Sequence, residues 1–249
     1  MNKIQLKNSL DGKVVVITGA SRGLGKSLAQ ALAKKGAKLV ISGRSEKDLK
    51  DVAKETGAIP VVADVTKEGD VIALAKAAYD KFGHIDIWIN NAGLWLPKSP
   101  VGEIDMKKAH ELIEVNLFGT IYGSRVAIEN MKDSGGTIVN IISTAGLQGR
   151  SGQSIYSASK HALRGFTDSI RLELAENVDT AAAGITVIGV YPGGIKTNFF
   201  DAAKPADFDD FMSPDFVADK IIENLEKEKP ETEQILKRPG QTWNKPASK

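Results

Sequence analysis

The run Lys13–Thr18 (KVVVIT), followed at once by Gly19–Gly25 (GASRGLG), decides how this chain folds. The β-branched run predicts a short buried strand, and the glycines after it predict a tight turn that leads into a helix at 26–35. Glycines in such a turn let a phosphate approach the backbone, and the first N–H groups of the helix attract that phosphate. Strand, glycine turn and helix in this order therefore predict a dinucleotide site.

Apolar strands and helical segments alternate along the rest of the sequence. We expect strands at 13–18, 38–42, 59–63, 85–89, 137–142, 185–190 and 233–237, and helices at 26–35, 46–55, 67–82, 104–131, 153–177 and 214–229. Strands that are apolar throughout are covered on both faces, which is typical of a parallel sheet. We therefore predict an α/β fold in one domain over residues 1–249. Its core is a single doubly wound parallel sheet of the Rossmann type, with about seven strands and helices on both faces.

Composition excludes several classes of function. The chain has 33 basic and 31 acidic residues, and this balance argues against a protein that binds nucleic acid by neutralising phosphates. It has no cysteine and three scattered histidines, so we expect no metal site and no thiolate chemistry. We see neither a signal peptide nor the roughly 18 apolar residues of a membrane helix, and expect a soluble, cytoplasmic protein without membrane contact.

The end of the second predicted strand bears on which dinucleotide binds. Gly43 stands where an NAD-preferring site carries an acidic residue, and Arg44 follows it. Arg22, inside the glycine turn, is placed to reach the same pocket. Two guanidiniums without a competing carboxylate suit the 2′-phosphate of NADP, so we predict NADP (NADPH) ahead of NAD. The alternative is that both arginines are solvated surface charges.

A second group of residues points to acid–base chemistry. Tyr156 and Lys160 are four residues apart at the start of a predicted helix, so they share one face, and the ammonium group would lower the tyrosine pKa. Ser143 directly follows the strand at 137–142, at the edge where ligands bind. Asn116 is a polar residue in an apolar helical stretch. Taken singly, these are also a surface pair, a helix cap and a buried structural amide.

Taken in order, the set resembles the short-chain dehydrogenase/reductase family, and a carbonyl reductase within it. The resemblance covers residues 11–200 and rests on Thr18–Gly25, Asn90–Gly93, Asn116, Ser143, Tyr156, Lys160 and Pro192-Gly193. It implies that Tyr156 is the general acid/base that protonates the carbonyl oxygen, and that Ser143 hydrogen-bonds the same oxygen. It also implies that Lys160 holds the nicotinamide ribose and lowers the pKa of Tyr156, and that Asn116 holds a water in a proton relay.

The resemblance also implies the contacts of both ligands. We expect Asp64 and Val65 at the adenine and the segment 192–197 at the nicotinamide carboxamide. The full set of cofactor residues is Gly19, Ser21, Arg22, Gly23, Leu24, Gly25, Arg44, Asp64, Val65, Asn91, Ala92, Gly93, Tyr156, Lys160, Pro192, Gly193, Ile195 and Thr197. For the substrate we expect Ser143 with an apolar pocket at Trp95 and Phe199, to which Leu94, Leu96 and Phe200 would add. The alternative is that Trp95 packs beneath a loop.

The predicted function is hydride transfer between NADP and a small-molecule carbonyl or alcohol. One alternative is a 3-oxoacyl-acyl-carrier-protein reductase, which the C-terminal sequence 233–240 disfavours because many family members have a glycine-rich DGG strand there. The other is a non-catalytic dinucleotide-binding regulatory protein. We expect a homodimer or homotetramer, a substrate lid or an ordinary surface loop at 198–212, and a mobile tail at 241–249.

Overall fold

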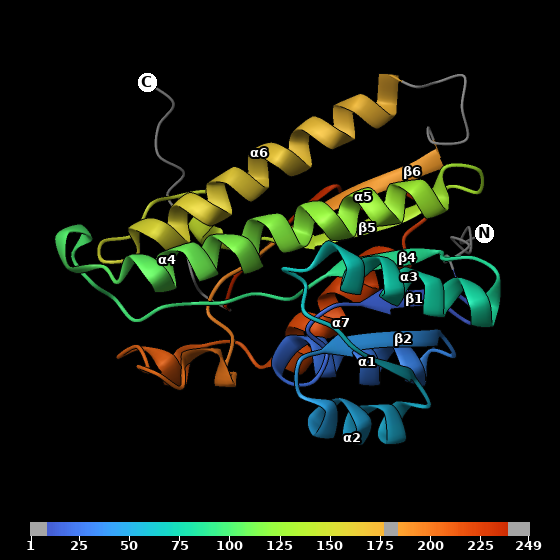
Figure 1. The fold of residues 1–249 in the computed structure, drawn as a ribbon, viewed down its shortest axis with the longest axis horizontal. Helices are drawn as coiled ribbons and strands as arrows, with labels where there is room; N and C mark the ends of the chain where they lie inside the picture. The colour runs from blue at the N-terminus through green and yellow to red at the C-terminus, as the bar shows by residue number, and fades with distance from the viewer. Residues whose placement is uncertain (1–8, 177–183, 239–249) are drawn as a thin grey trace, which may run out of the picture.

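The computed structural model describes residues 9–176 and 184–238 of the chain, so the expected tail at 241–249 lies outside the described residues. Its core is one sheet with the strand order β3-β2-β1-β4-β5-β6-β7, in which every neighbouring pair is parallel (Figure 1). The strands are β1 (Val14–Ile17), β2 (Lys38–Gly43), β3 (Ile59–Val62), β4 (Ile87–Asn90), β5 (Gly136–Ile141), β6 (Ile185–Pro192) and β7 (Glu233–Leu236). The predicted doubly wound parallel sheet is confirmed.

Helices cover both faces of the sheet, as predicted. They are α1 (Gly23–Lys34), α2 (Glu46–Thr56), α3 (Glu68–Phe82), α4 (Met106–Ile113), α5 (Gly119–Met131), α6 (Ser154–Glu176) and α7 (Pro214–Leu225). Helices α1, α2 and α7 enclose one apolar core, and α3, α5 and α6 enclose the other (Figure 1). Val15 and Ile17 of β1 belong to the first core, whereas Val14 and Val16 belong to the second. Burial on both faces explains why this strand is apolar throughout.

The expected single helix at 104–131 is wrong in detail. Asp105 caps α4 by accepting hydrogen bonds from the N–H groups of Lys107 and Lys108. Between α4 and α5 the chain forms a π-helical stretch, Glu114–Phe118, in which the N–H of Gly119 bonds to the carbonyl of Glu114. Single π turns inside helices are frequent at functional sites. This one contains Asn116.

Two other helix boundaries differ from the prediction by three or more residues. Helix α1 begins at Gly23, inside the glycine turn, and α7 ends at Leu225 instead of 229. The early end of α7 has a local cause, because the Asn224 side chain binds both the N–H and the carbonyl of Glu231. These two bonds turn the chain back toward β7.

The order of the strands places a crevice beside β1. The chain leaves β1 for β2 on one side and reaches β4 on the other, so the loops after β1 and β4 diverge at the carboxyl edge of the sheet. Ligands of open parallel sheets bind at this point of reversal. The sheet topology alone therefore directs attention to the loops after β1 and β4.

Candidate active site

A cavity of about 590 Å³ lies at this carboxyl edge. Loops after β1 to β6 contribute to it, which is the usual composition of a ligand site in a parallel sheet. The predicted residues that line it are Gly19, Ser21, Arg22, Gly23, Leu24, Gly25, Arg44, Asp64, Val65, Asn91, Ala92, Gly93, Trp95, Ser143, Tyr156, Lys160, Pro192, Gly193, Ile195, Thr197 and Phe199. Asn116 and Leu96 are not among its lining residues, whereas Leu94 and Phe200 are.

The glycine turn has no room for side chains. Gly19 has a φ of +65°, and a Cβ there would lie 2.7 Å from the Cα of Ala92. A Cβ on Gly25 would collide with the carbonyl oxygen of Gly19 and lie 2.5 Å from the Asn91 amide nitrogen. Helix α1 begins without a side-chain cap and without an acidic residue in its first turn. Its first N–H groups are therefore suited to a phosphate, which fits a dinucleotide.

The loop after β4 is fastened to the glycine turn. The Thr18 hydroxyl accepts hydrogen bonds from the N–H groups of Asn91 (3.0 Å) and Ala92 (3.1 Å). In return, the Asn91 amide donates to the carbonyls of Thr18 (2.9 Å) and Gly19 (3.1 Å). These bonds hold the two loops of the crevice in one rigid frame, so Asn91 orients the turn through its side chain.

The end of the cavity beyond β2 carries both signs of charge. Arg44 lies there with Nη1 3.8 Å from Oε1 of Glu111, and both side chains are more than half exposed. The prediction of NADP assumed no competing carboxylate, but Asp48 of α2 also lines the cavity. It was missed because it stands in the first turn of the next helix, beyond the strand end where an acidic residue was sought.

Asp64 lies deeper along the same wall. Burial raises the pKa of its carboxyl, but hydrogen bonds from the N–H and hydroxyl of Thr66 and the charge of Arg44 hold that pKa below its ordinary value. A carboxylate whose acceptor oxygen is used in this way is ionised and held in one position. A carboxylate fixed in this way suits the role predicted for Asp64 at the adenine end of the cavity.

Ser143 and Tyr156 come together at the other end of the cavity. The Ser143 hydroxyl is hydrogen-bonded to the Tyr156 side chain, and it also accepts the N–H of Ala145 at 3.1 Å. Among the described residues, Ser143 alone outside glycine has a positive φ, 138°. Backbone strain of this kind costs about 1–3 kcal/mol and collects at functional sites. Ser143 therefore caps the short helix Thr144–Gly146, as one alternative predicted, and it is also the hydrogen-bond partner of Tyr156.

Burial raises the pKa of Tyr156, while the hydrogen bond from Ser143 and the charge of Arg150 oppose that rise. The sequence analysis expected Lys160 to lower this pKa. Lys160 is itself buried, and burial lowers the pKa of its ammonium to about 7. Its Nζ donates to the carbonyl of Ile141 at 3.1 Å and lies 5.8 Å from the centre of the Tyr156 ring. Arg150 is the cation that lowers the pKa of Tyr156 in this structure, and the effect expected of Lys160 stays a prediction.

Asn116 is buried behind the cavity. Its amide accepts the N–H of Leu94 at 2.7 Å and donates to the Leu94 carbonyl at 2.9 Å and to the Ser159 hydroxyl at 3.2 Å. The side chain therefore joins the loop after β4 to α6, which carries Tyr156. This is the structural amide that the sequence analysis weighed as the alternative. The relay water expected at Asn116 stays a prediction.

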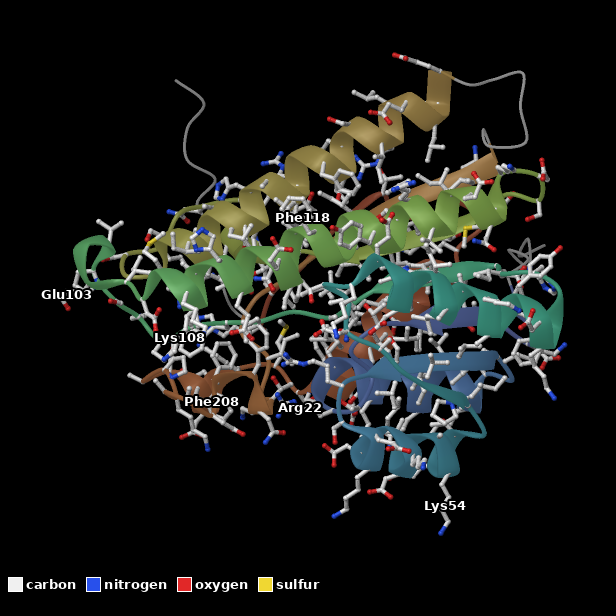
Figure 2. The ribbon with its side chains drawn as sticks, viewed as in Figure 1. Arg22, Lys54, Glu103, Lys108, Phe118 and Phe208 are labelled. Carbon is white, nitrogen blue, oxygen red and sulfur yellow. The ribbon has the colours of Figure 1, made fainter. Side chains whose placement is uncertain are left out.

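An aromatic wall closes the substrate end. Phe199 meets the Tyr156 ring edge-on at 6.3 Å, and Phe200 meets Trp95 at 5.1 Å. Phe208 and Phe211 continue the cluster, at 6.1 Å and 5.3 Å from Phe200. In Figure 2, Phe208 lies on the segment that follows β6, on the same side of the view as the end of α4. The predicted apolar pocket is therefore a continuous surface beside the tyrosine.

The segment that carries these phenylalanines is tied at its base. The N–H of Lys196 donates to the carbonyl of Met212 at 2.8 Å, and the N–H of Met212 donates to the carbonyl of Gly194 at 3.0 Å. A Cβ on Gly194 would lie 2.5 Å from the Phe211 ring, so glycine lets the loop close over its own base. These bonds hold the two ends of the segment together, so the loop between them is anchored at its base.

Several lining residues were not predicted from the sequence, among them Asp48, Lys98, Arg150 and Gln153. Arg150 lies seven residues after Ser143 and six before Tyr156, so its place between two site residues was a usable signal. Within the described parts of the chain, no three His, Asp or Glu side chains gather as a metal site. No helix in those parts is both long and apolar enough to span a membrane.

A doubly wound parallel sheet with a glycine turn at its point of reversal and a serine–tyrosine pair at its carboxyl edge defines a class of nucleotide-binding proteins. Comparison with known sequences identifies the family: the short chain dehydrogenase pattern matches residues 13–207. The chain belongs to the short-chain dehydrogenase family.

Relatives with curated names are oxidoreductases. The chain is similar to the oxidoreductase YxnA of Bacillus subtilis (strain 168), with 37% identity over 237 residues, which is 88% of this chain and 64% of that protein. It thus spans less than two thirds of that relative. It is also similar to an oxidoreductase of Staphylococcus aureus (strain USA300), with 34% identity over 88% of this chain and 94% of the relative.

Two solved structures share the fold and bind nicotinamide nucleotides. An alcohol dehydrogenase from the archaeon Thermococcus sibiricus, complexed with 5-hydroxy-NADP, has a TM-score of 0.81 at 27% identity and covers 94% of this chain and 100% of its own. A 3-ketoacyl-(acyl-carrier-protein) reductase from Brucella melitensis, complexed with NADH, has a TM-score of 0.83 at 29% identity, over 91% and 97%. A nicotinamide dinucleotide is therefore the supported cofactor.

Proposed function

We propose that this oxidoreductase uses NADP to interconvert a small-molecule carbonyl compound and the corresponding alcohol, with Tyr156 as general acid/base. The observation that carries the proposal is one cavity with the glycine turn at one end and the hydrogen-bonded Ser143–Tyr156 pair at the other. The cavity thus offers N–H groups suited to an anion at one end and a proton donor at the other. The likeness to an enzyme complexed with 5-hydroxy-NADP supports the choice of nucleotide.

The first N–H groups of α1 would hold the pyrophosphate, and Arg22 and Arg44 the 2′-phosphate. When bound, the nicotinamide gives or takes a hydride. Ser143 and the phenol of Tyr156 orient the carbonyl oxygen between them. Burial keeps the pKa of Tyr156 above its ordinary value, so the phenol holds its proton at neutral pH. It can then pass that proton to the alkoxide, which is the stronger base.

The charges around Tyr156 stabilise the phenolate that this transfer leaves. Arg150 places a positive charge close enough to lower its pKa, and the single O–H of Ser143 can turn to the phenolate once the alcohol oxygen has taken its proton. Lys160, which lies beneath the tyrosine ring, would hold the nicotinamide ribose. The aromatic segment 198–212 would cover the substrate and exclude water. The homodimer or homotetramer and the cytoplasmic location remain predictions.

A 3-oxoacyl-acyl-carrier-protein reductase is the second candidate. Its support is the likeness to the reductase of Brucella melitensis, which has the higher TM-score of the two solved structures described above. Both candidates need the same tyrosine and differ in the substrate, so a substrate panel separates them.

The test is oxidation of NADPH and NADH by the purified protein with ketones, aldehydes and 3-oxoacyl thioesters. Turnover that disappears in Tyr156→Phe would support the proposal, and a preference for the thioesters would favour the second candidate. Tight NADPH binding without turnover of any of these compounds would point to a regulatory, non-catalytic protein.

Replacing Gly43 with aspartate is expected to lower the ratio of kcat/KM for NADPH to that for NADH by at least about tenfold, because the new carboxylate repels a 2′-phosphate and accepts the ribose hydroxyls. The nearest atoms to a Cβ at Gly43 belong to Ser21, with Oγ at 3.1 Å and Cβ at 3.2 Å, so a shift of a few tenths of an ångström in the glycine turn makes room for it. Steady-state kinetics with both nucleotides measure the ratio. An unchanged ratio would contradict the assignment of NADP.

A further inference from the structure

Two basic side chains line the substrate end of the cavity. Lys98 comes from the loop after β4, and Arg150 from the loop between β5 and α6. The N–H of Ser99 donates to the carbonyl of Gly152 at 2.9 Å, which fastens the two loops together. They also pack closely, since a Cβ on Gly152 would lie 3.1 Å from the Cβ of Lys98. The two cations therefore belong to one local structure.

Arg150 differs from most other arginines of the protein. Across residues 9–176 and 184–238, a carboxylate lies within 4.0 Å of each of Arg44, Arg125, Arg164, Arg171 and Arg238. In those same ranges, Arg22 and Arg150 form no such pair, and both line the cavity. Arg22 stands in the glycine turn, where the nucleotide phosphates account for its charge. Neither a carboxylate of the described residues nor a nucleotide phosphate accounts for the charge of Arg150, so a second anion would be its partner.

The guanidinium of Arg150 is held beside the reacting groups. Its Nη2 donates to the Thr144 hydroxyl at 2.7 Å, directly after Ser143, and its charge acts on Tyr156. An arginine has five N–H donors, so most of them remain for a ligand. Asp207 also lines the cavity, but its Oδ2 lies 3.6 Å from Nη2 of Arg238. That carboxylate already has a basic partner.

The substrate end also has an apolar surface. Phe199 and Trp95 line the cavity there, and their rings meet Tyr156 and Phe200 edge-on. A molecule with an apolar body, a carbonyl and an anionic end would satisfy all of these groups. Its carbonyl would lie at Ser143 and Tyr156, and its anionic end at the forked guanidinium.

We propose that the substrate is an oxo acid, a carbonyl compound whose carboxylate binds to Arg150 and Lys98 while its apolar body packs against Trp95 and Phe199. This inference rests on the proposed function and names the substrate class for it. Arginine matches a carboxylate with two parallel N–H···O bonds, whereas the ammonium of Lys98 adds a point charge. Arg150 is the specificity-determining residue of the pair.

The experiment compares three oxo acids with their methyl esters: 4-oxopentanoate, 6-oxoheptanoate and 4-acetylbenzoate. The esters keep the ketone and the apolar body and replace the negative charge with an uncharged methyl ester. For at least one pair, wild-type enzyme is expected to give a kcat/KM for the acid at least about tenfold above that for the ester. In Arg150→Met this acid-to-ester ratio should fall by about 10- to 100-fold, and in Lys98→Met by a smaller factor.

The ratio separates recognition from other effects of Arg150. Loss of its charge also raises the pKa of Tyr156, but that change slows the acid and the ester alike and leaves their ratio unchanged. Arg150→Lys should restore part of the ratio. Arg125→Met, which removes an exposed arginine on α5 paired with Glu68, is the matched charge control and should leave the ratio as it is in wild type.

Each other outcome decides against the inference. A wild-type ratio at or below one, or a ratio that Arg150→Met leaves unchanged, would overturn the oxo-acid assignment. Failure of wild type to reduce any of the three acids would also overturn it. In each case, Tyr156-dependent reduction of neutral ketones would leave the proposed function in place, whereas its absence over the whole panel would remove that function as well.

Discussion

Replacing Tyr156 with phenylalanine is expected to lower kcat by about 100- to 10,000-fold, the range that a positioned general acid contributes. The substitution removes the phenol that donates the proton and keeps the ring that packs against Phe199 at 6.3 Å. Ser143 and Arg150 remain, so substrate orientation persists without proton transfer. Stopped-flow and steady-state measurements of NADPH oxidation, with a ketone that wild type reduces, give kcat.

The same variant should bind NADPH within about twofold of wild type, because the phosphates are proposed to bind at the glycine turn, at the other end of the cavity. Tyr79→Phe, which removes a hydroxyl from an exposed tyrosine on α3, is the control and should leave kcat unchanged. A Tyr156→Phe enzyme that retains more than about a tenth of wild-type kcat would refute the role of the phenol.

Replacing Lys160 with methionine is expected to stabilise the fold while impairing turnover. Burial lowers the pKa of Lys160 from 10.5 to about 7, which corresponds to roughly 4–5 kcal/mol of unfavourable burial of the charged form. Methionine fills a similar volume without a charge. After allowing about 1 kcal/mol for the lost hydrogen bond to Ile141, the free energy of unfolding should rise by roughly 2–4 kcal/mol at about pH 6.

The pH dependence follows from the direction of this pKa change. Between pH values of about 7 and 10.5 the unfolded chain binds the proton of Lys160 and the folded chain does not, so wild-type stability rises with pH over that window. The advantage of Lys160→Met should therefore be largest below about pH 7 and shrink toward zero by about pH 10. Urea unfolding across this range measures it.

Lys54→Met serves as the matched control, since Lys54 is an exposed lysine on α2 that points away from the protein in Figure 2. It should change stability little at any of these pH values. A Lys160→Met protein that unfolds more readily than wild type at about pH 6 would show that the charged ammonium is stabilised where it lies. A gain in stability with a loss of turnover would show that a functional lysine is kept at a cost to the fold.

Local features of this molecule could be predicted because their causes are local. The apolar run of β1, the glycines that follow it and the four-residue spacing of Tyr156 and Lys160 each act through neighbours in the chain. The boundaries of α1 and α7 and the π-helical stretch at Glu114–Phe118 were missed, because they depend on backbone and side-chain bonds that the apolar periodicity does not report.

The sequence by itself determined the alternation of strands and helices, the glycine turn after β1, and the family order of serine, tyrosine and lysine. Only the tertiary structure decided what surrounds them. It placed Asn116 behind the cavity, Asp48 beside Arg44 in the cavity wall, and Lys98 and Arg150 in adjoining loops beside Ser143. The burial and the charge around a site residue depend on loops that are distant along the chain. They can therefore be determined only once the sheet has brought those loops together at one edge.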